Sequence, residues 1–98
     1  MVTFAVAREL LAAALPDLTV GRHGSDTGTH WIPATGHGAD DDGEPLVYAI
    51  GGTVPAVDKT TGAIVELQGA PANPDAWAWR AVYLAPSGEL VSPPDFLA

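Results

Sequence analysis

The stretch from Gly51 to Leu67 constrains the fold more than any other, because it has the pattern of a β-hairpin. Val57 and its neighbours form one β-branched run and Ile64 to Leu67 form another, with a polar turn between them that ends in Gly62. Glycine readily takes the positive φ angle that hairpin loops of roughly three to five residues require. Pro55 has no amide hydrogen for a ladder, so we expect the first strand to begin there or to run along a sheet edge.

The N-terminal segment from Phe4 to Leu15 is predicted to be an amphipathic helix, with Thr3 as its N-cap. Pro16 should end this helix. Its apolar stripe recurs at spacings of three and four residues and comprises Phe4, Ala7, Leu10, Leu11, Ala14 and Leu15.

Short strands are expected between this helix and the hairpin. Residues 18–20 should form a strand that Gly21 closes, and residues 22–28 should form a turn-rich connection. Residues 29–32 read as a second strand, which Pro33 ends or confines to an edge. Residues 46–50 are continuously apolar, which is typical of a central strand covered on both faces.

The segment 73–84 is open to two interpretations. Asn73 followed by Pro74 could cap a helix over residues 76–84, yet large and small side chains alternate along the same residues. We favour a strand, because aromatic and β-branched residues fit a pleated surface. Residues 83–91 then resemble a second hairpin with Pro86 and Gly88 in its turn.

These elements predict a single α+β domain over residues 1–98, with one N-terminal helix packed on an antiparallel sheet of about five or six strands. The chain has no cysteine, which excludes disulfides and thiolate chemistry. No apolar run approaches the roughly 20 residues of a membrane span, and no secretory leader is evident, so we expect a cytoplasmic protein.

The charge is strongly acidic, with 12 Asp and Glu against 4 Lys and Arg and a formal net charge of −8. The basic residues are scattered, so neither nucleic acid nor an anionic membrane is an expected partner. A basic protein surface would be attracted, although solubility alone also accounts for such a charge.

Two groups of residues are candidate partner-binding sites. The first is an acidic loop, in which clustered carboxylates favour solvent or a basic partner; it comprises Asp40, Asp41, Asp42 and Glu44. It lacks the alternating spacing of a calcium loop. The second group is Trp77 and Trp79, which share a face if their segment is a strand. We expect them to be core residues that cover the sheet or the helix; if their face were exposed, they would be strong interface anchors.

No catalytic, cofactor or metal site is expected. His23, His30 and His37 recur every seven residues, but sequence spacing alone does not bring three imidazoles together around an ion. The serines lie in turn-like contexts without a nucleophile-elbow pattern.

The hairpin and its surroundings resemble the YrhB-like, immunity-protein-35 family. The matching elements are the N-terminal helix, Trp31, Gly52 with Pro55, Val57-Asp58 and Thr61-Gly62. PepSY-type domains, which share a helix-plus-sheet layout, are a second resemblance. The first implies an immunity protein that binds and blocks a cognate bacterial toxin, and it implies no catalytic residues.

The leading hypothesis is therefore a non-enzymatic protein-binding module, with the acidic loop steering a basic surface and the aromatic pair securing it. A structural subunit of a virion or secretion particle, whose sheet edges pair between copies as a homo-oligomer, is the alternative. A small enzyme or ligand-binding module would instead require a deep pocket lined by these polar residues.

Overall fold

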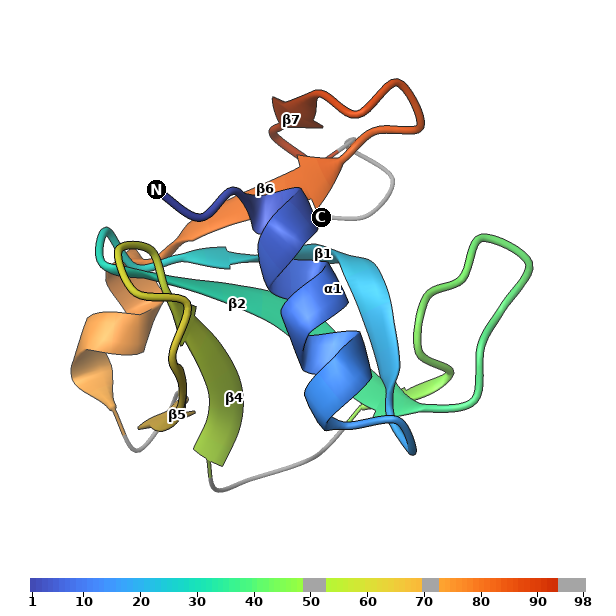
Figure 1. The fold of residues 1–98 in the computed structure, drawn as a ribbon, viewed down its shortest axis with the longest axis horizontal. Coiled ribbons are helices and arrows are strands. Elements are labelled where there is room, and N and C mark those ends of the chain that lie inside the picture. Colours follow the sequence, from blue (N-terminus) through green and yellow to red (C-terminus); the bar gives the residue numbers. More distant parts are fainter. Residues whose placement is uncertain (49–52, 70–72, 94–98) are drawn as a thin grey trace.

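One helix lies across a strongly bent antiparallel sheet in this computed structural model, which describes residues 1–48, 53–69 and 73–93 (Figure 1). The α+β class and the single N-terminal helix confirm the prediction. The elements in chain order are α1 (Phe4–Ala14), β1 (Thr19–Asp26), β2 (His30–His37), β3 (Val47–Tyr48), β4 (Thr53–Asp58), β5 (Ile64–Gln68), the 3-10 helix η1 (Pro74–Ala78), β6 (Arg80–Leu84) and β7 (Leu90–Val91).

The described strands follow the order β5-β4-β2-β1-β6-β7, and all pairs are antiparallel. The short strand β3 pairs with the far end of β2, at Gly36 and His37, whereas β4 pairs with its beginning, at His30 and Trp31. Since β1 takes the other edge of β2, β3 and β4 share one edge, and no pairing between them along the middle of β2 is found among the described residues.

Helix α1 begins at the predicted cap, where the Thr3 hydroxyl oxygen accepts a hydrogen bond of 3.2 Å from the amide of Val6. Its buried residues are Phe4, Ala7 and Leu11, spaced as an amphipathic stripe requires. This face lies over β1, β2 and β4, so the helix covers one side of the sheet.

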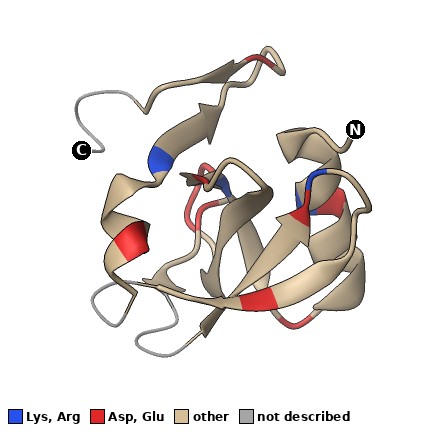
Figure 2. Ribbon diagram, turned by 90° about the vertical axis from the view of Figure 1, so that its left-hand side faces the viewer, with Lys and Arg blue, Asp and Glu red and all other residues tan. Residues whose placement is uncertain are grey.

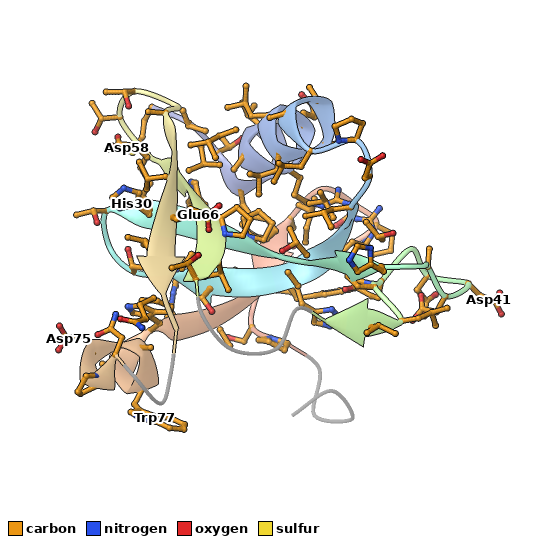
Figure 3. All side chains as sticks on the ribbon, turned by 90° about the horizontal axis from the view of Figure 1, so that it is seen from below. His30, Asp41, Asp58, Glu66, Asp75 and Trp77 are labelled. Carbon is orange, nitrogen blue, oxygen red and sulfur yellow. The ribbon has the colours of Figure 1, made fainter. Side chains whose placement is uncertain are left out.

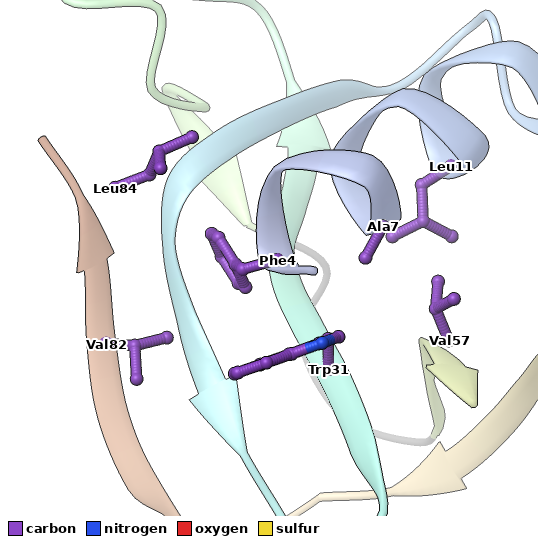
Figure 4. Packing of buried hydrophobic residues seen from close by; sticks show 7 residues of the cluster. All are labelled: Phe4, Ala7, Leu11, Trp31, Val57, Val82 and Leu84. Atoms are coloured by element: carbon purple, nitrogen blue, oxygen red, sulfur yellow. The ribbon is translucent and has the colours of Figure 1, made fainter. Parts of the chain in front are cut away.

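Trp31 is the central residue of the core beneath the helix (Figure 4). Its ring meets Phe4 edge-to-face, with centroids 5.7 Å apart, and its indole N–H donates to the carbonyl of Val2 at 2.8 Å. Lys59 places its ammonium 4.0 Å from the centroid of the same ring. Val57, Val82 and Leu84 complete the packing from β4 and β6.

Both predicted hairpins are present. In the first, Asp58 donates its amide to the carbonyl of Ala63 at 2.9 Å, and Gly62 has a φ of 77°. The Asp58 carboxylate accepts hydrogen bonds from the amides of Thr60 and Thr61, which closes the turn. In the second, β6 pairs with β7, with Tyr83 opposite Val91.

The predicted end of the first strand at Gly21 is wrong, because β1 continues through Gly21 and Gly24 to Asp26. Neither glycine has a positive φ; both allow a close approach. A Cβ on Gly21 would lie 2.3 Å from a carboxylate oxygen of Glu44, and one on Gly24 would lie 2.4 Å from the carbonyl oxygen of Ile32 and 2.8 Å from the Phe4 ring.

Pro33 was expected to end a strand or confine it to an edge, and Pro55 to begin a strand or run along an edge; both lie inside strands and are buried. Pro33 falls in the middle of β2, which has no ladder partner from the described residues on the edge shared by β3 and β4. Pro55 falls where β4 pairs with β5 alone, since β2 reaches only Val57 and Asp58. Each proline therefore lacks its amide hydrogen on the side where the described strands form no ladder, so no hydrogen bond is lost there.

Two further expectations are corrected. The apolar run 46–50 is not a central strand: only Val47–Tyr48 is assigned, at an edge, and Leu46 and Val47 are 63% and 59% exposed. Residues 49 and 50 lie outside the described part. The segment 73–84 divides, with η1 following the Asn73 cap and the expected strand beginning only at Arg80. No helix within the described residues is long and apolar enough to cross a membrane.

The close approach at Gly24 predicts a stability effect. Gly24→Ala should lower the free energy of unfolding by about 1 to 3 kcal/mol, because the added methyl displaces Phe4 or the β2 backbone. Urea unfolding measures this. Gly69→Ala is the matched control, since nothing lies within 4 Å of the position of its added Cβ, and it should be neutral or slightly stabilising. Equal stability of Gly24→Ala and wild type would contradict the packing described.

Candidate protein-binding surface

The acidic loop is closed by its own first carboxylate. Asp40 Oδ1 accepts hydrogen bonds from the amides of Asp42 and Glu44, each 2.9 Å long, and the amide of Asp40 donates to the carbonyl of Glu44 at 2.9 Å. Asp40 therefore shapes the loop, and its carboxylate is already occupied by backbone donors.

Glu44 differs from the expectation of a solvated side chain, because it is only 7% exposed. Its carboxylate accepts the amide of Arg22 at 2.6 Å, and its second oxygen lies 2.8 Å from Nδ1 of His23. The His23 contact has the distance of an ion pair without the angular geometry of a hydrogen bond. Burial turns Glu44 into the anchor of the loop, not a contact for a partner.

Only Asp41 and Asp42 of the predicted cluster are both exposed and without a hydrogen bond to their carboxylates from the described residues. Figure 3 shows Asp41 on the side of the molecule away from Trp77 and Asp75. The structure thus divides the predicted binding residues into two separate places, and one small contact cannot include both.

Exposed apolar and acidic side chains also occur on β5 and η1, which together we call the β5–η1 surface: Ile64, Val65, Glu66, Asp75 and Trp77. Ile64 and Glu66 share one face of the strand, and Val65 lies on the other. Asn73 connects its two elements, because its amide nitrogen donates to the carbonyl of Gln68 at 2.9 Å while its oxygen caps the amide of Asp75. Figure 3 places Glu66, Asp75 and Trp77 in the same half of the view, opposite Asp41.

Trp77 is 74% exposed, so the core interpretation is wrong for this residue. It lies on η1 and Trp79 follows it, so the two do not share a strand face. Trp79 is half-buried and lines a hollow of about 530 Å³ together with Thr29, His30 and Asp75. Indole rings dominate protein interfaces because they bury a large area at a small entropy cost.

Sequence reasoning missed Glu66, Asp75 and the exposed edge of β5. The available signal was a charged residue in the middle of a β-branched run, which is typical of an edge strand.

Each basic side chain donates a hydrogen bond within the protein, although that of Arg80 is 68% exposed. Arg8 donates to the carbonyls of Val20 and Gly21, Arg22 to that of Leu84, and Lys59 and Arg80 to the carboxylate of Asp26. Burial, and next the neighbouring Arg22, lower the pKa of Arg8.

The charged positions marked along the ribbon in Figure 2 are mostly acidic. The exposed carboxylates of the described residues are those of Glu9, Asp17, Asp40, Asp41, Asp42, Glu66, Asp75 and Glu89. This distribution creates a negative field that the internally bound cations neutralise poorly.

Asp26 is the most heavily bonded carboxylate of the sheet. Lys59 contacts one oxygen at 2.6 Å and Arg80 the other at 2.9 Å, and the amide of Gly28 adds a bond of 2.8 Å. Burial alone would raise the pKa of Asp26, but these hydrogen bonds outweigh it and lower the pKa below its usual value.

The three histidines lie apart. His23 faces Glu44 and stacks on Tyr83 with centroids 4.9 Å apart, His30 lies at the start of β2, and His37 is exposed at its end. Among the described residues, no three His, Asp or Glu side chains are grouped as metal ligands.

His30 lies between a hydroxyl and a carboxylate, as the histidine of a hydrolytic triad does, but its distance to the carboxylate is longer than in a triad. Its Nδ1 lies 2.8 Å from the hydroxyl of Thr29, but its Nε2 is 3.8 Å from Asp58, beyond hydrogen-bond distance. Bonds from the amides of Thr61 and Thr60 lower the pKa of Asp58, so this carboxylate is engaged in the turn. The Asp58 carboxylate thus bonds to the turn amides and not to His30.

Comparison with protein-family models, curated proteins and solved structures finds no match for this chain.

The ion pairs of Asp26 predict a pH-dependent stability. Asp26→Asn should lower the free energy of unfolding at pH 7 by about 1 to 2 kcal/mol, because two cations lose their charged partner. Since folding lowers the pKa of Asp26, its stabilisation is complete above about pH 4 and is lost as the pH falls through the native pKa.

Urea unfolding from pH 7 down to pH 2 measures this effect, and the difference between wild type and variant should shrink below about pH 4. Arg80→Gln is the control: it removes the exposed partner and should cost less than Asp26→Asn. A difference that stayed constant down to pH 2 would contradict the assignment.

Proposed function

We propose that this chain is a non-enzymatic protein-binding module of the immunity type, which binds and neutralises a cognate bacterial toxin in the cytoplasm. The observation that carries the proposal is the distribution of charge: every Lys and Arg is bonded internally, while exposed carboxylates flank an exposed indole. A partner with a basic and partly apolar surface complements this arrangement.

The proposed mechanism is steric occlusion. Trp77 inserts into the partner as the anchor, and Glu66 and Asp75 meet cationic side chains around it. Asp41 and Asp42, on the other side of the molecule, contribute to long-range attraction during approach. No bond is made or broken in the partner; its active site is covered.

A second candidate function is a structural subunit of a particle. The observation that favours it is the terminal position of β5 in the described sheet, since an edge strand can pair with another copy. A ring or higher oligomer in light scattering would support this alternative, and a monomer or dimer would support the toxin-binding module.

The gene immediately upstream provides the direct test. We expect it to encode a large secreted toxin, and co-expression of this chain should restore growth of cells that produce that toxin. A neighbourhood of capsid or tail genes, or a toxin whose effect this chain leaves unchanged, would overturn the proposal.

The anchor role of Trp77 predicts a loss of affinity. Trp77→Ala should weaken binding to the toxin by about thirtyfold or more, because a central indole typically contributes about 2 kcal/mol or more. Isothermal titration calorimetry measures the dissociation constant. Leu46→Ala is the matched control, since Leu46 is 63% exposed but lies beside the acidic loop. Equal affinities of Trp77→Ala and wild type would place the contact elsewhere.

The acidic loop should affect the rate of association. Replacing Asp41 and Asp42 by Asn should slow binding about twofold to fivefold at low salt, with little change in the dissociation rate. Stopped-flow mixing at several salt concentrations measures both rates. The pair Glu9→Gln and Asp17→Asn removes the same charge from α1 and the residues after it, and shows how much of the effect is general. If the association rate and its salt dependence were unchanged in the Asp41 and Asp42 variant, the acidic loop would have no part in the proposed mechanism.

A further inference from the structure

Within the part of the chain that the structure describes, no strand pairs with the outer edge of β5, whose outward backbone groups have a defined spacing. Bonded and non-bonded pairs alternate along an antiparallel ladder. The amide of Asp58 donates to the carbonyl of Ala63, and the register places Val57 opposite Ile64 and Pro55 opposite Glu66. The amide and carbonyl groups of Ile64 and Glu66 therefore point away from β4.

The contact at Gln68 supports this assignment. By the same alternation the carbonyl of Gln68 points outward, and it accepts the side-chain amide of Asn73 instead of a strand partner. The edge available to another chain thus extends from Ile64 to Glu66 and ends against η1. The side chains along it are exposed, with Ile64 and Val65 each 38% accessible.

We propose that this edge binds an extended, basic segment of the partner protein as an additional antiparallel or parallel strand. This inference rests on the proposed protein-binding function and names its mode. Backbone hydrogen bonds would supply affinity, and a Lys or Arg opposite Glu66 would supply specificity. Asp75 lies in the first turn of η1, at the end of the edge, where it extends the acidic character.

Charge argues against a second copy of this chain as the occupant. Antiparallel self-pairing centred on Glu66 places Glu66 opposite Glu66, and like charges directly opposite are destabilising. Self-pairing over Ile64–Glu66 alone places Glu66 opposite Ile64, which offers its carboxylate no cationic partner. Arg80, the cation nearest in sequence to η1, donates to Asp26 and does not neutralise the edge. A cationic strand from another protein meets neither problem.

Proline at position 66 gives a selective test. Because the amide of Glu66 points outward, Glu66→Pro removes a donor from the edge without removing a bond to β4. Glu66→Gln retains the donor and removes only the charge. Glu89→Gln, in the β6–β7 turn, removes the same charge from a remote position.

The probe is a capped eight-residue peptide of alternating lysine and valine, titrated into the full chain labelled with ¹⁵N. We expect saturable binding and slower amide exchange at Ile64 and Glu66, with little change at Val65 and Leu67, whose amides already bond to β4. Glu66→Pro should weaken binding about tenfold or more, Glu66→Gln about twofold to fivefold at low salt, and Glu89→Gln less than twofold.

Three results would overturn the proposal: no saturable binding up to 1 mM peptide, equal binding by Glu66→Pro and wild type, or protection elsewhere than on β5. If Glu66→Pro fails to fold, the exchange pattern of the wild type decides alone. A wild type that dimerises through β5 would make a second copy the occupant and would also overturn it. Toxin binding could depend on Trp77 but not on the amide of residue 66. That result would rule out binding by strand addition, while the proposed protein-binding function would still hold.

Discussion

The indole of Trp31 connects the helix to the sheet, and the positions of the other elements depend on this connection. Its N–H bonds to the carbonyl of Val2, its face lies beneath Lys59, and its edge meets Phe4. The side chain of Trp31, which belongs to β2, thereby contacts two segments that are distant in sequence: the residues before α1 and the β4–β5 turn. Because β1 and β6 extend the sheet from β2, the directions of the outer strands follow from the same contact.

Local sequence signals were sufficient to predict the start of the helix and the turn of the first hairpin. Thr3 marks the start of α1, and Gly62 marks the first hairpin, because capping and positive φ are properties of a few adjacent residues. Gly21 and Gly24 carried no such information. Their lack of a side chain makes room for Glu44 and Phe4, which are remote in sequence, so a continuous strand was mistaken for a turn.

The sequence showed which acidic and aromatic residues could bind a partner, but not which of them are exposed or lie close together. Asp40 to Asp42 and Glu44 form one acidic run in the sequence, yet Glu44 is buried against the Arg22 amide and His23, and backbone amides occupy one oxygen of the exposed Asp40. Trp77 and Trp79 alternate as strand residues do, but the Asn73 cap and the following proline start a 3-10 turn that separates them. Whether a side chain faces water depends on tertiary contacts that no local pattern contains.

The buried carboxylate of Glu44 anchors the acidic loop to the sheet, so the tip of the loop contributes little to the rest of the fold. Gly43 has open space around its α-carbon, and the exposed residues Asp41 and Asp42 pack against nothing that the core requires. Insertions or charge changes at this tip would leave the anchor unchanged, whereas loss of Glu44 would release the whole segment. Divergent evolution could therefore vary the length and charge of the loop freely, and so retune which macromolecules approach, at almost no cost in stability.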